Sequence, residues 1–394
     1  MPQPRYLAPW HQPDLIEAWK KLERRALAAD ASRAGAGAGS RSGAHAAALS
    51  GPELDAAALA ALRGKPAIYH CISRVVDRQF VLGPPEKEQF VRYMRAYELF
   101  GQVRVLAFSV MSNHFHILLE VPAPPPERGR DWSDAQFLNH LSLLYSEREL
   151  GRIRWDLEHF RDLGIDDAAL ALRDRFFRRM WDLSAFMKSL KQRFTRWFNR
   201  QHARKGTLWE ERFKSVLVES GHAARVMAAY IDLNAVRAGI VEDPGDYRWC
   251  SYGEAMAGRQ RAREGLQRVM CESACAAQGE GPDPDSPLHP EAVAALQSWK
   301  VAAQHYRQAL VGALERRGGP ERPGGKVRVS EGEALGHRVR HFVDGMVIGS
   351  TGFVDRAFRW TRDRFGPQRR DGARRIRGVA TELRSMRDLS FGDA

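Results

Sequence analysis

The sequence VLAFSVMSNHFHILLEV, residues 105–121, consists of two apolar segments joined by a short polar corner. Apolar segments of this kind, rich in β-branched residues, are typical of paired strands near the middle of a sheet. Because side chains alternate faces along a strand, His114 and His116 project from the same side, about 7 Å apart along the backbone. Phe115, between them, points to the opposite face. The stretch therefore predicts a sheet that presents two imidazoles on one face.

The two histidines allow two interpretations. Imidazoles placed in this way can share one divalent cation, and histidine is the commonest metal ligand. The alternative is one surface histidine beside one core histidine, and the pair alone does not decide between them. An apolar strand has little other use for two histidines, which favours the metal site.

The flanking segments predict an α+β fold. A strand with the sequence AIYHCISRVV begins near Lys65, and a helix follows from about Pro85 to Phe100. The order strand, helix, strand, strand indicates an antiparallel sheet with helices on one face. Further along the chain, the spacing of apolar residues predicts a helix that begins at its N-cap, Ser184, and ends at about His202. A strand at 213–220 and a helix from Gly221 to about Val236 follow.

The composition indicates a polyanionic partner. The chain of 394 residues carries a formal net charge of +13, for which nucleic acid is the first candidate and a membrane surface the alternative. There is no apolar run of about 18 residues and no signal-peptide pattern, so we expect a cytoplasmic, nucleoid-associated protein that does not bind membranes. The four cysteines do not form a disulfide framework. Cys71 and Cys250 resemble buried apolar residues, and Cys271 and Cys275 are spaced like half a zinc site without a second half nearby.

Changes in composition divide the chain into segments. Residues 1–64 predict an N-terminal helix and a flexible Ala/Gly-rich stretch, and residues 65–255 form the core domain, interrupted at about 122–183 by a helical insertion. Residues 256–325 are interpreted as a linker with a helix, and residues 326–394 as a basic helical region. That last region predicts two helices around a Gly-containing turn, a layout compatible with a DNA-binding helix-turn-helix. The second helix carries Arg356, Arg359, Arg362 and Arg364. A packed helical hairpin is the alternative.

A tyrosine and an asparagine supply a second candidate half of the site. Tyr230 and Asn234 lie four residues apart in the predicted helix and therefore share a face. Taken alone, a tyrosine such as Tyr230 is more often a half-buried core residue. Its phenol could also attack a phosphodiester, with a nearby cation offsetting the small ionised fraction of a tyrosine at neutral pH. The Asn234 oxygen with two imidazole nitrogens would suit Mg²⁺ or Mn²⁺ more than structural zinc.

Basic and aromatic residues mark a candidate surface for single-stranded DNA. Cations interleaved with flat rings are typical of grooves that hold an unpaired strand. A solvated basic turn with its tryptophans in the core is the alternative. The candidate DNA-binding residues are Arg74, Lys188, Lys191, Arg196, Arg200, Arg204, Lys205, Trp209, Arg212 and Lys214.

Four blocks in this order resemble a known family. They are YHCISRVVDRQFVL, VLAFSVMSNHFHILLEV, GTLWEERFKSVLVES and AAYIDLNAVRAGIVEDPGDYRWCSY, within residues 65–121 and 184–253. Together they resemble the single-tyrosine transposases of small insertion sequences, most closely the REP-associated branch. The resemblance implies a ferredoxin-like antiparallel sheet, the HUH endonuclease fold. It also implies cleavage of hairpin-bearing single-stranded DNA through a 5′-phosphotyrosine, by a monomer or homodimer.

The resemblance assigns roles by position. His114 and His116 match the metal-binding pair, Tyr230 matches the nucleophile, and Asn234 matches the polar ligand that follows it. One departure is Ala235, where the family pattern has proline, so the helix need not end there.

Two rival functions compete with cleavage of DNA. A catalytically silent, repeat-binding regulatory protein would keep the fold, but nothing in a binder requires the two histidines, the tyrosine and the asparagine together. A metallohydrolase would need further His and Asp ligands and the strand-helix repeat of a barrel, which the sequence lacks. The candidate residues for cleavage, His114, His116, Tyr230 and Asn234, all precede residue 235. Truncation after about residue 315 is therefore expected to weaken DNA binding and spare the chemistry.

Overall fold

The computed structural model describes residues 65–277, 298–314, 329–330, 335, 339–362, 365, 368–376 and 379–387. The predictions for residues 1–64 and for Arg364 lie outside these residues, as does the side chain of Cys275. The predicted domain boundaries stay predictions.

A seven-stranded mixed sheet forms the centre of the fold and confirms the α+β class. Across the sheet the strands are β2 (Arg104–Val110), β3 (His114–Val121), β1 (Ala67–Arg74), β4 (Lys214–Val218), β6 (Val347–Gly349), β9 (Arg384–Met386) and β7 (Arg374–Arg375). Neighbouring strands are antiparallel except β4 and β6, which are parallel. The expectation of a purely antiparallel sheet is therefore wrong at that pair. A separate parallel pair joins β5 (Val329–Ser330) and β8 (Val379–Ala380).

The sequence pattern of residues 105–121 produces the central hairpin as predicted. β2 and β3 pair antiparallel, and the Met111 N–H donates to the His114 carbonyl at 2.8 Å to close the turn. On its other side β3 pairs with β1, where Ile72 lies opposite His116. The histidines thus lie on an interior strand with neighbours on both sides.

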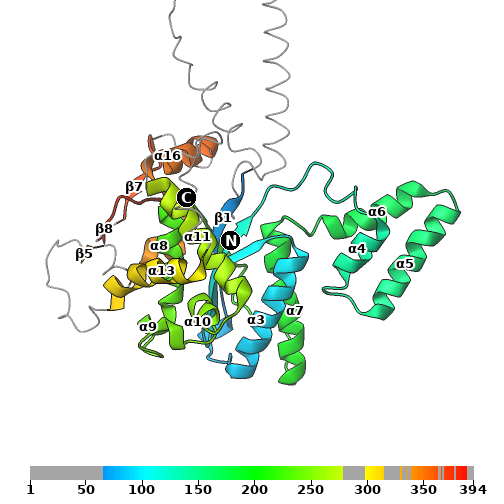
Figure 1. Cartoon of the computed structure of the whole chain (residues 1–394), viewed down its shortest axis with the longest axis horizontal. Helices are drawn as coiled ribbons and strands as arrows, with labels where there is room; N and C mark the ends of the chain where they lie inside the picture. Colours follow the sequence, from blue (N-terminus) through cyan, green and yellow to red (C-terminus); the bar gives the residue numbers. More distant parts are fainter. Residues whose placement is uncertain are drawn as a thin grey trace, which may run out of the picture.

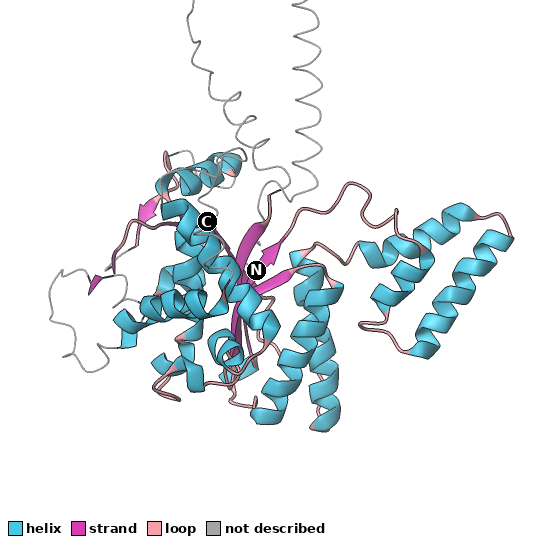
Figure 2. Cartoon of the chain, viewed as in Figure 1, coloured by secondary structure: helices cyan, strands magenta, loops and turns pink. Residues whose placement is uncertain are grey.

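Helices cover both faces of this sheet, as Figures 1 and 2 show. On one side lie α3 (Pro84–Phe100) and α7 (Leu183–Gln201), and on the other α8 (His222–Asp232), α10 (Ser251–Met256) and α11 (Gln260–Ala277), with α13 (Trp299–Leu314) against α11. The prediction of helices on one face only is wrong. Both faces of β1 are apolar: Tyr69 and Cys71 belong to one buried cluster, and Ile68 and Ile72 belong to the other. A strand with two apolar faces needs a layer on each side.

Three helices occupy the expected insertion between β3 and α7: α4 (Asp134–Leu141), α5 (Glu147–Asp162) and α6 (Asp166–Phe177). We call them the inserted helices; Figure 1 shows them side by side, projecting from the sheet. They contact the end of α3, where the His140 ring donates from Nε2 to the Phe100 carbonyl at 2.8 Å. The next helix, α7, begins earlier than predicted, because Asp182 rather than Ser184 caps it and accepts from the Ala185 N–H at 2.6 Å.

The helix that carries Tyr230 is interrupted. α8 ends at Asp232 and α9 (Asn234–Arg237) begins after Leu233, whose ψ of 1° departs from helical geometry. The expectation of one continuous helix to Val236 is therefore wrong, although no proline is present. Hydrogen bonds still span the junction, since the Leu233 N–H donates to the Ala229 carbonyl at 3.0 Å. Short 3₁₀ turns occur at η2 (Val76–Arg78) and η3 (Pro244–Asp246).

The C-terminal region joins the sheet instead of forming a helix-turn-helix. Between α15 (Arg340–Asp344) and α16 (Thr351–Trp360) lies strand β6, and the Leu217 N–H of β4 donates to the Met346 carbonyl at 2.8 Å. The helix-turn-helix interpretation is wrong, because the apolar segment between the helices is buried as a strand. Val347 and Ile348 are 0% and 1% exposed.

This arrangement changes the expected effect of truncation. Removing the chain after residue 315 deletes β6 and the buried side chains of Phe342, Val347 and Ile348. Because full burial of each such side chain contributes about 1.5–3 kcal/mol, the truncated chain should lose several kcal/mol of unfolding free energy. A urea titration of both chains tests this, and an unchanged midpoint and slope would contradict it.

Candidate functional site

The predicted histidine pair lies beneath α8, on the face of the sheet opposite α3 and α7. The ring centroids of His114 and His116 are 5.1 Å apart. His116 is 4% exposed and His114 is half-buried. The pair therefore combines one interior imidazole with one closer to the surface.

Tyr230 reaches the same place from α8. Its ring centroid is 6.4 Å from that of His116, and the Asn234 Nδ2 atom lies 3.4 Å from His114 Nε2. The structure thus brings together all four residues assigned to cleavage and metal binding: His114, His116, Tyr230 and Asn234. Folding joins them from two segments more than a hundred residues apart, which is the main geometric support for a shared site.

A third histidine, His70 of β1, orients His116. The Phe342 carbonyl can only accept a hydrogen bond, so His70 Nδ1 must donate to it, at 2.8 Å. In a neutral ring His70 Nε2 is then an acceptor, and it receives the bond from His116 Nδ1 at 2.8 Å. His116 Nε2 consequently keeps its lone pair. Outer partners of this kind fix the tautomer that a metal ligand needs.

The protonation states agree with this assignment. Burial, together with the nearby Arg237 charge, lowers the pKa of His70 to about 4 and outweighs the hydrogen bond to the Phe342 carbonyl. Burial, and then the charges of His70 and His114, lower the pKa of His116 well below its ordinary value. Both rings are therefore neutral at pH 7, as metal ligation requires.

Arg237 sets the orientation of Asn234. A guanidinium only donates, so the contact of Arg237 Nη2 at 3.2 Å places the Asn234 oxygen toward it. The amide nitrogen of Asn234 then faces His114 Nε2. On its other side the His114 ring donates from Nδ1 to the Asn113 side-chain oxygen at 2.7 Å. His114 thus also presents its Nε2 lone pair toward the site.

The side chains fit a bound metal ion in part. His116 presents a neutral imidazole with its Nε2 lone pair, and His114 Nε2 faces the Asn234 amide nitrogen at 3.4 Å; imidazole nitrogens suit a divalent cation. The third expected ligand does not fit as it stands, because the Asn234 oxygen is engaged by Arg237. Within the described part of the chain, no group of three or more His, Cys, Asp or Glu side chains could hold a metal ion. A metallohydrolase with several acidic ligands therefore has no support at this site.

Tyr230 is enclosed in this structure. Its side chain is 2% exposed, and the Phe342 ring of α15 packs against it edge-on at 5.0 Å between centroids. The Arg237 guanidinium lies 3.9 Å from the centre of the Tyr230 ring and donates to the Tyr230 carbonyl at 2.8 Å. The phenol is therefore not open to a phosphate in this conformation.

Sequence reasoning missed the roles of His70 and Arg237. Arg237 follows Tyr230 by seven residues and Asn234 by three, a helical spacing that places all three on one side. His70 belongs to the predicted strand AIYHCISRVV. Its period-two position in an apolar strand was the available signal.

A buried acid, also not predicted, holds α8 in place. Asp232 accepts hydrogen bonds from the Ser251 hydroxyl at 2.6 Å, the Tyr252 N–H at 3.0 Å and the Tyr306 hydroxyl at 2.7 Å. Burial raises the pKa of Asp232 to about 6, and these hydrogen bonds oppose the rise. The carboxyl ties the Tyr230 helix to α10 and α13.

The candidate DNA-binding residues do not form one surface around the histidines. Those of α7, which are Lys188, Lys191, Arg196 and Arg200, lie across the sheet from them. Arg74 alone pairs directly with His114 across β1 and β3. Lys191 donates to the Glu211 carbonyl at 2.8 Å, and Lys214 pairs with Asp344 at 3.3 Å. Lys205 and Arg212 are exposed, and Arg204 is partly exposed.

Trp209 requires a correction. It is 6% exposed and packs among Phe90, Phe115 and Phe194 in the core. Its ring therefore has no open face on which a base could stack. The alternative stated for the tryptophans, a place in the core, holds for this residue. Cys71 and Cys250 are fully buried as predicted, and Cys271 is half-buried.

Comparisons with known proteins give little further information. No protein-family model matches the chain, and no curated protein matches it. Among solved structures the chain is similar to a REP-associated tyrosine transposase bound to a REP hairpin, at 12% sequence identity. The likeness covers 49% of this chain and 80% of that chain, with a TM-score of 0.32. Similarity at this level supports no conclusion about the fold or the function of this chain. None of the described helices has the length and apolar character needed to cross a membrane.

Proposed function

We propose that the protein is a metal-dependent, single-stranded DNA endonuclease and strand transferase of the HUH type, with Tyr230 as nucleophile. The observation that carries the proposal is the convergence of the Tyr230 ring and the His116 ring, 6.4 Å apart, from distant segments. His114 lies beside them, with 5.1 Å between the two histidine rings. The expected partner is hairpin-bearing single-stranded DNA, and the net charge of +13 supports a polyanion.

The chemistry requires an in-line attack by the phenol. The Tyr230 oxygen forms a bond to phosphorus while the bond to the 3′ oxygen breaks, which leaves a 5′-phosphotyrosine and a free 3′ hydroxyl. Mg²⁺ or Mn²⁺ bound by His114 and His116, with Asn234 as third ligand, would neutralise the phosphate charge. His70 keeps the His116 ring in the required tautomer through its hydrogen bond.

The enclosed site corresponds to a closed state in this proposal. Phe342 covers the Tyr230 ring, and Arg237 holds the Asn234 oxygen. Opening requires α15 to move away and the Asn234 amide to turn its oxygen toward the histidines. α15 has five residues, Arg340–Asp344, so the moving element is short.

A catalytically silent repeat-DNA-binding protein is the second candidate. The 2% exposure of Tyr230 favours it, because a buried phenol contributes to stability without any reaction. The arrangement of His70, His114 and His116 has no evident use in such a protein. Cleavage therefore remains the first proposal.

Substrate form tests the proposal. We expect hairpin-flanked single strands incubated with Mn²⁺ to be cut and to give a covalent adduct on a denaturing gel, because the phenol needs an unpaired strand for in-line approach. The same sequence as a full duplex should not be cut. Equal cleavage of the duplex would refute the single-strand assignment, and hairpin binding without an adduct would support the silent regulator.

A further inference from the structure

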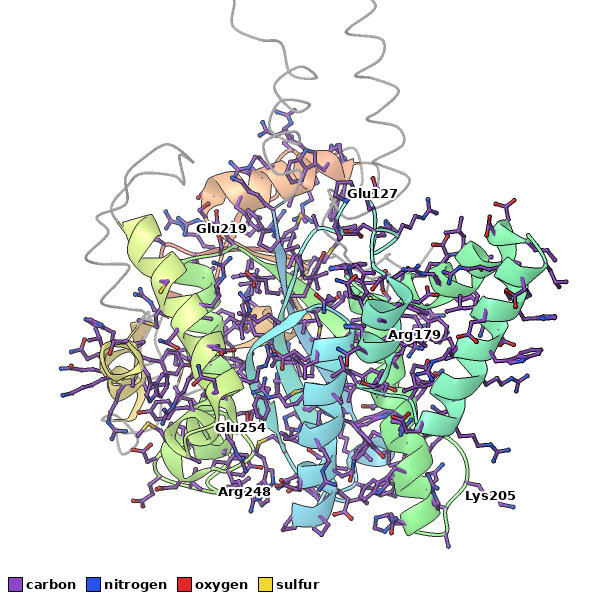
Figure 3. All side chains as sticks on the ribbon, turned by 45° about the vertical axis from the view of Figure 1, so that its right-hand side comes forward. Glu127, Arg179, Lys205, Glu219, Arg248 and Glu254 are labelled. Atoms are coloured by element: carbon purple, nitrogen blue, oxygen red, sulfur yellow. The ribbon has the colours of Figure 1, made fainter. Side chains whose placement is uncertain are left out.

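A cavity of about 490 Å³ lies where the inserted helices meet α3 and α7, on the opposite side of the sheet from the histidines. Four arginines line it: Arg193, Arg196 and Arg200 of α7, and Arg179 from the end of the insertion. We call it the cationic cavity. Figure 3 labels Arg179 on the side where the inserted helices approach α7.

Arginines outnumber carboxylates in the lining of the cavity. Its lining includes one carboxylate, Glu149, which already accepts hydrogen bonds from the Ser146 N–H at 2.8 Å and hydroxyl at 2.7 Å. Among the described residues, none of the four arginines forms an ion pair with an acidic side chain. The charges also affect Tyr97: burial raises the pKa of its hydroxyl, and the charges of Arg193, Arg179 and Arg196 oppose that rise.

Three tyrosines complete the lining. Tyr93 and Tyr97 come from α3, and Tyr145 lies between α4 and α5. The Arg193 guanidinium lies 5.5 Å from the centre of the Tyr93 ring, and Arg179 hydrogen-bonds to the Tyr145 hydroxyl. Rings and guanidinium groups are thus interleaved in one concave surface, with Tyr93 and Tyr145 partly exposed.

We propose that the cationic cavity binds a segment of single-stranded nucleic acid, with arginines on the phosphates and the faces of Tyr93 and Tyr145 against the bases. Guanidinium forks match phosphate oxygens, and stacking on aromatic rings tolerates any base. An acidic polypeptide would use the charges but would give the partly exposed rings of Tyr93 and Tyr145 no comparable role, so nucleic acid is the better match.

The proposal gives the insertion a function. Arg179 and Tyr145 belong to residues 122–183, so this surface exists because the insertion docks on α3 and α7. The cavity goes beyond the proposed cleavage site, because it lies on the other face of the sheet and contains none of its residues. Its binding does not depend on whether Tyr230 reacts.

A charge-matched pair of variants tests the cavity. Both are made in the full chain with Tyr230→Phe, so that cleavage cannot affect the measurement. The first carries Arg193→Gln and Arg196→Gln. The control carries Arg152→Gln and Arg154→Gln, two exposed arginines of α5 that do not line the cavity. All four side chains are exposed, so both variants should fold, and thermal midpoints check this.

Fluorescence anisotropy with a labelled dT12 oligonucleotide gives the readout. The cavity variant should bind about 10-fold more weakly than the parent, and the salt dependence, log Kd against log salt, should become shallower by about 1.4, because two phosphate contacts are lost. The control should stay within about 2-fold. Equal losses in both variants would show a bulk charge effect and overturn the site, as would no loss in either. Stronger, cavity-dependent binding of a 12-residue poly-glutamate peptide would overturn the choice of nucleic acid.

Discussion

Replacing Tyr230 with phenylalanine should reduce covalent adduct formation by at least about 10³-fold, as expected when the nucleophile itself is removed. Affinity for the hairpin strand should change by less than about 2-fold. The phenylalanine ring keeps the packing against Phe342 and the contact with Arg237, so the substitution deletes the attacking oxygen and leaves the ring in place. Adduct formation on a denaturing gel and binding by anisotropy measure the two quantities.

Tyr247→Phe is the matched control. Tyr247 is 3% exposed, and its hydroxyl donates to the Val110 carbonyl at 2.7 Å, so the change also deletes one buried hydroxyl. It should lower stability by about 1 kcal/mol and leave adduct formation intact. An adduct that persists in the Tyr230 variant would show that another residue is the nucleophile.

Substituting either His114 or His116 with alanine should remove cleavage, and EDTA added to the unmodified protein should have the same effect. Each change deletes an Nε2 lone pair that the hydrogen bonds of His70 and Asn113 keep directed to the site. Mn²⁺ binding, followed by the paramagnetic resonance signal of the free ion, should weaken by at least about 10-fold in both variants.

His159→Ala is the control for these histidines. His159 is exposed on α5, stacks on Trp155 with 4.8 Å between ring centroids, and lies outside the site. It should retain both Mn²⁺ binding and cleavage. Cleavage that continues in excess EDTA would rule out the metal-dependent mechanism, whatever the variants do.

The sequence by itself determined the parts of the fold that depend on local pattern. The two apolar segments and the polar corner of residues 105–121 predicted the β2–β3 hairpin, and the alternation of side chains along a strand predicted the shared side of His114 and His116; the structure has both. The helical spacing between Tyr230 and Asn234 survived the interruption at Leu233. Periods of two and of 3.6 residues arise from backbone geometry within a few residues, so they can be recognised in one short stretch.

Only the tertiary structure decided what surrounds those elements. Strand β6 has three residues, too few to show a period, and it became a strand because β4 offered an unpaired edge. The hydrogen bond from His70 to the Phe342 carbonyl joins residues 272 positions apart. The sequence around Trp209 does not show whether its ring faces DNA or the core. Packing among Phe90, Phe115 and Phe194 places it in the core. Such contacts result from the global burial of apolar surface, which no local pattern specifies.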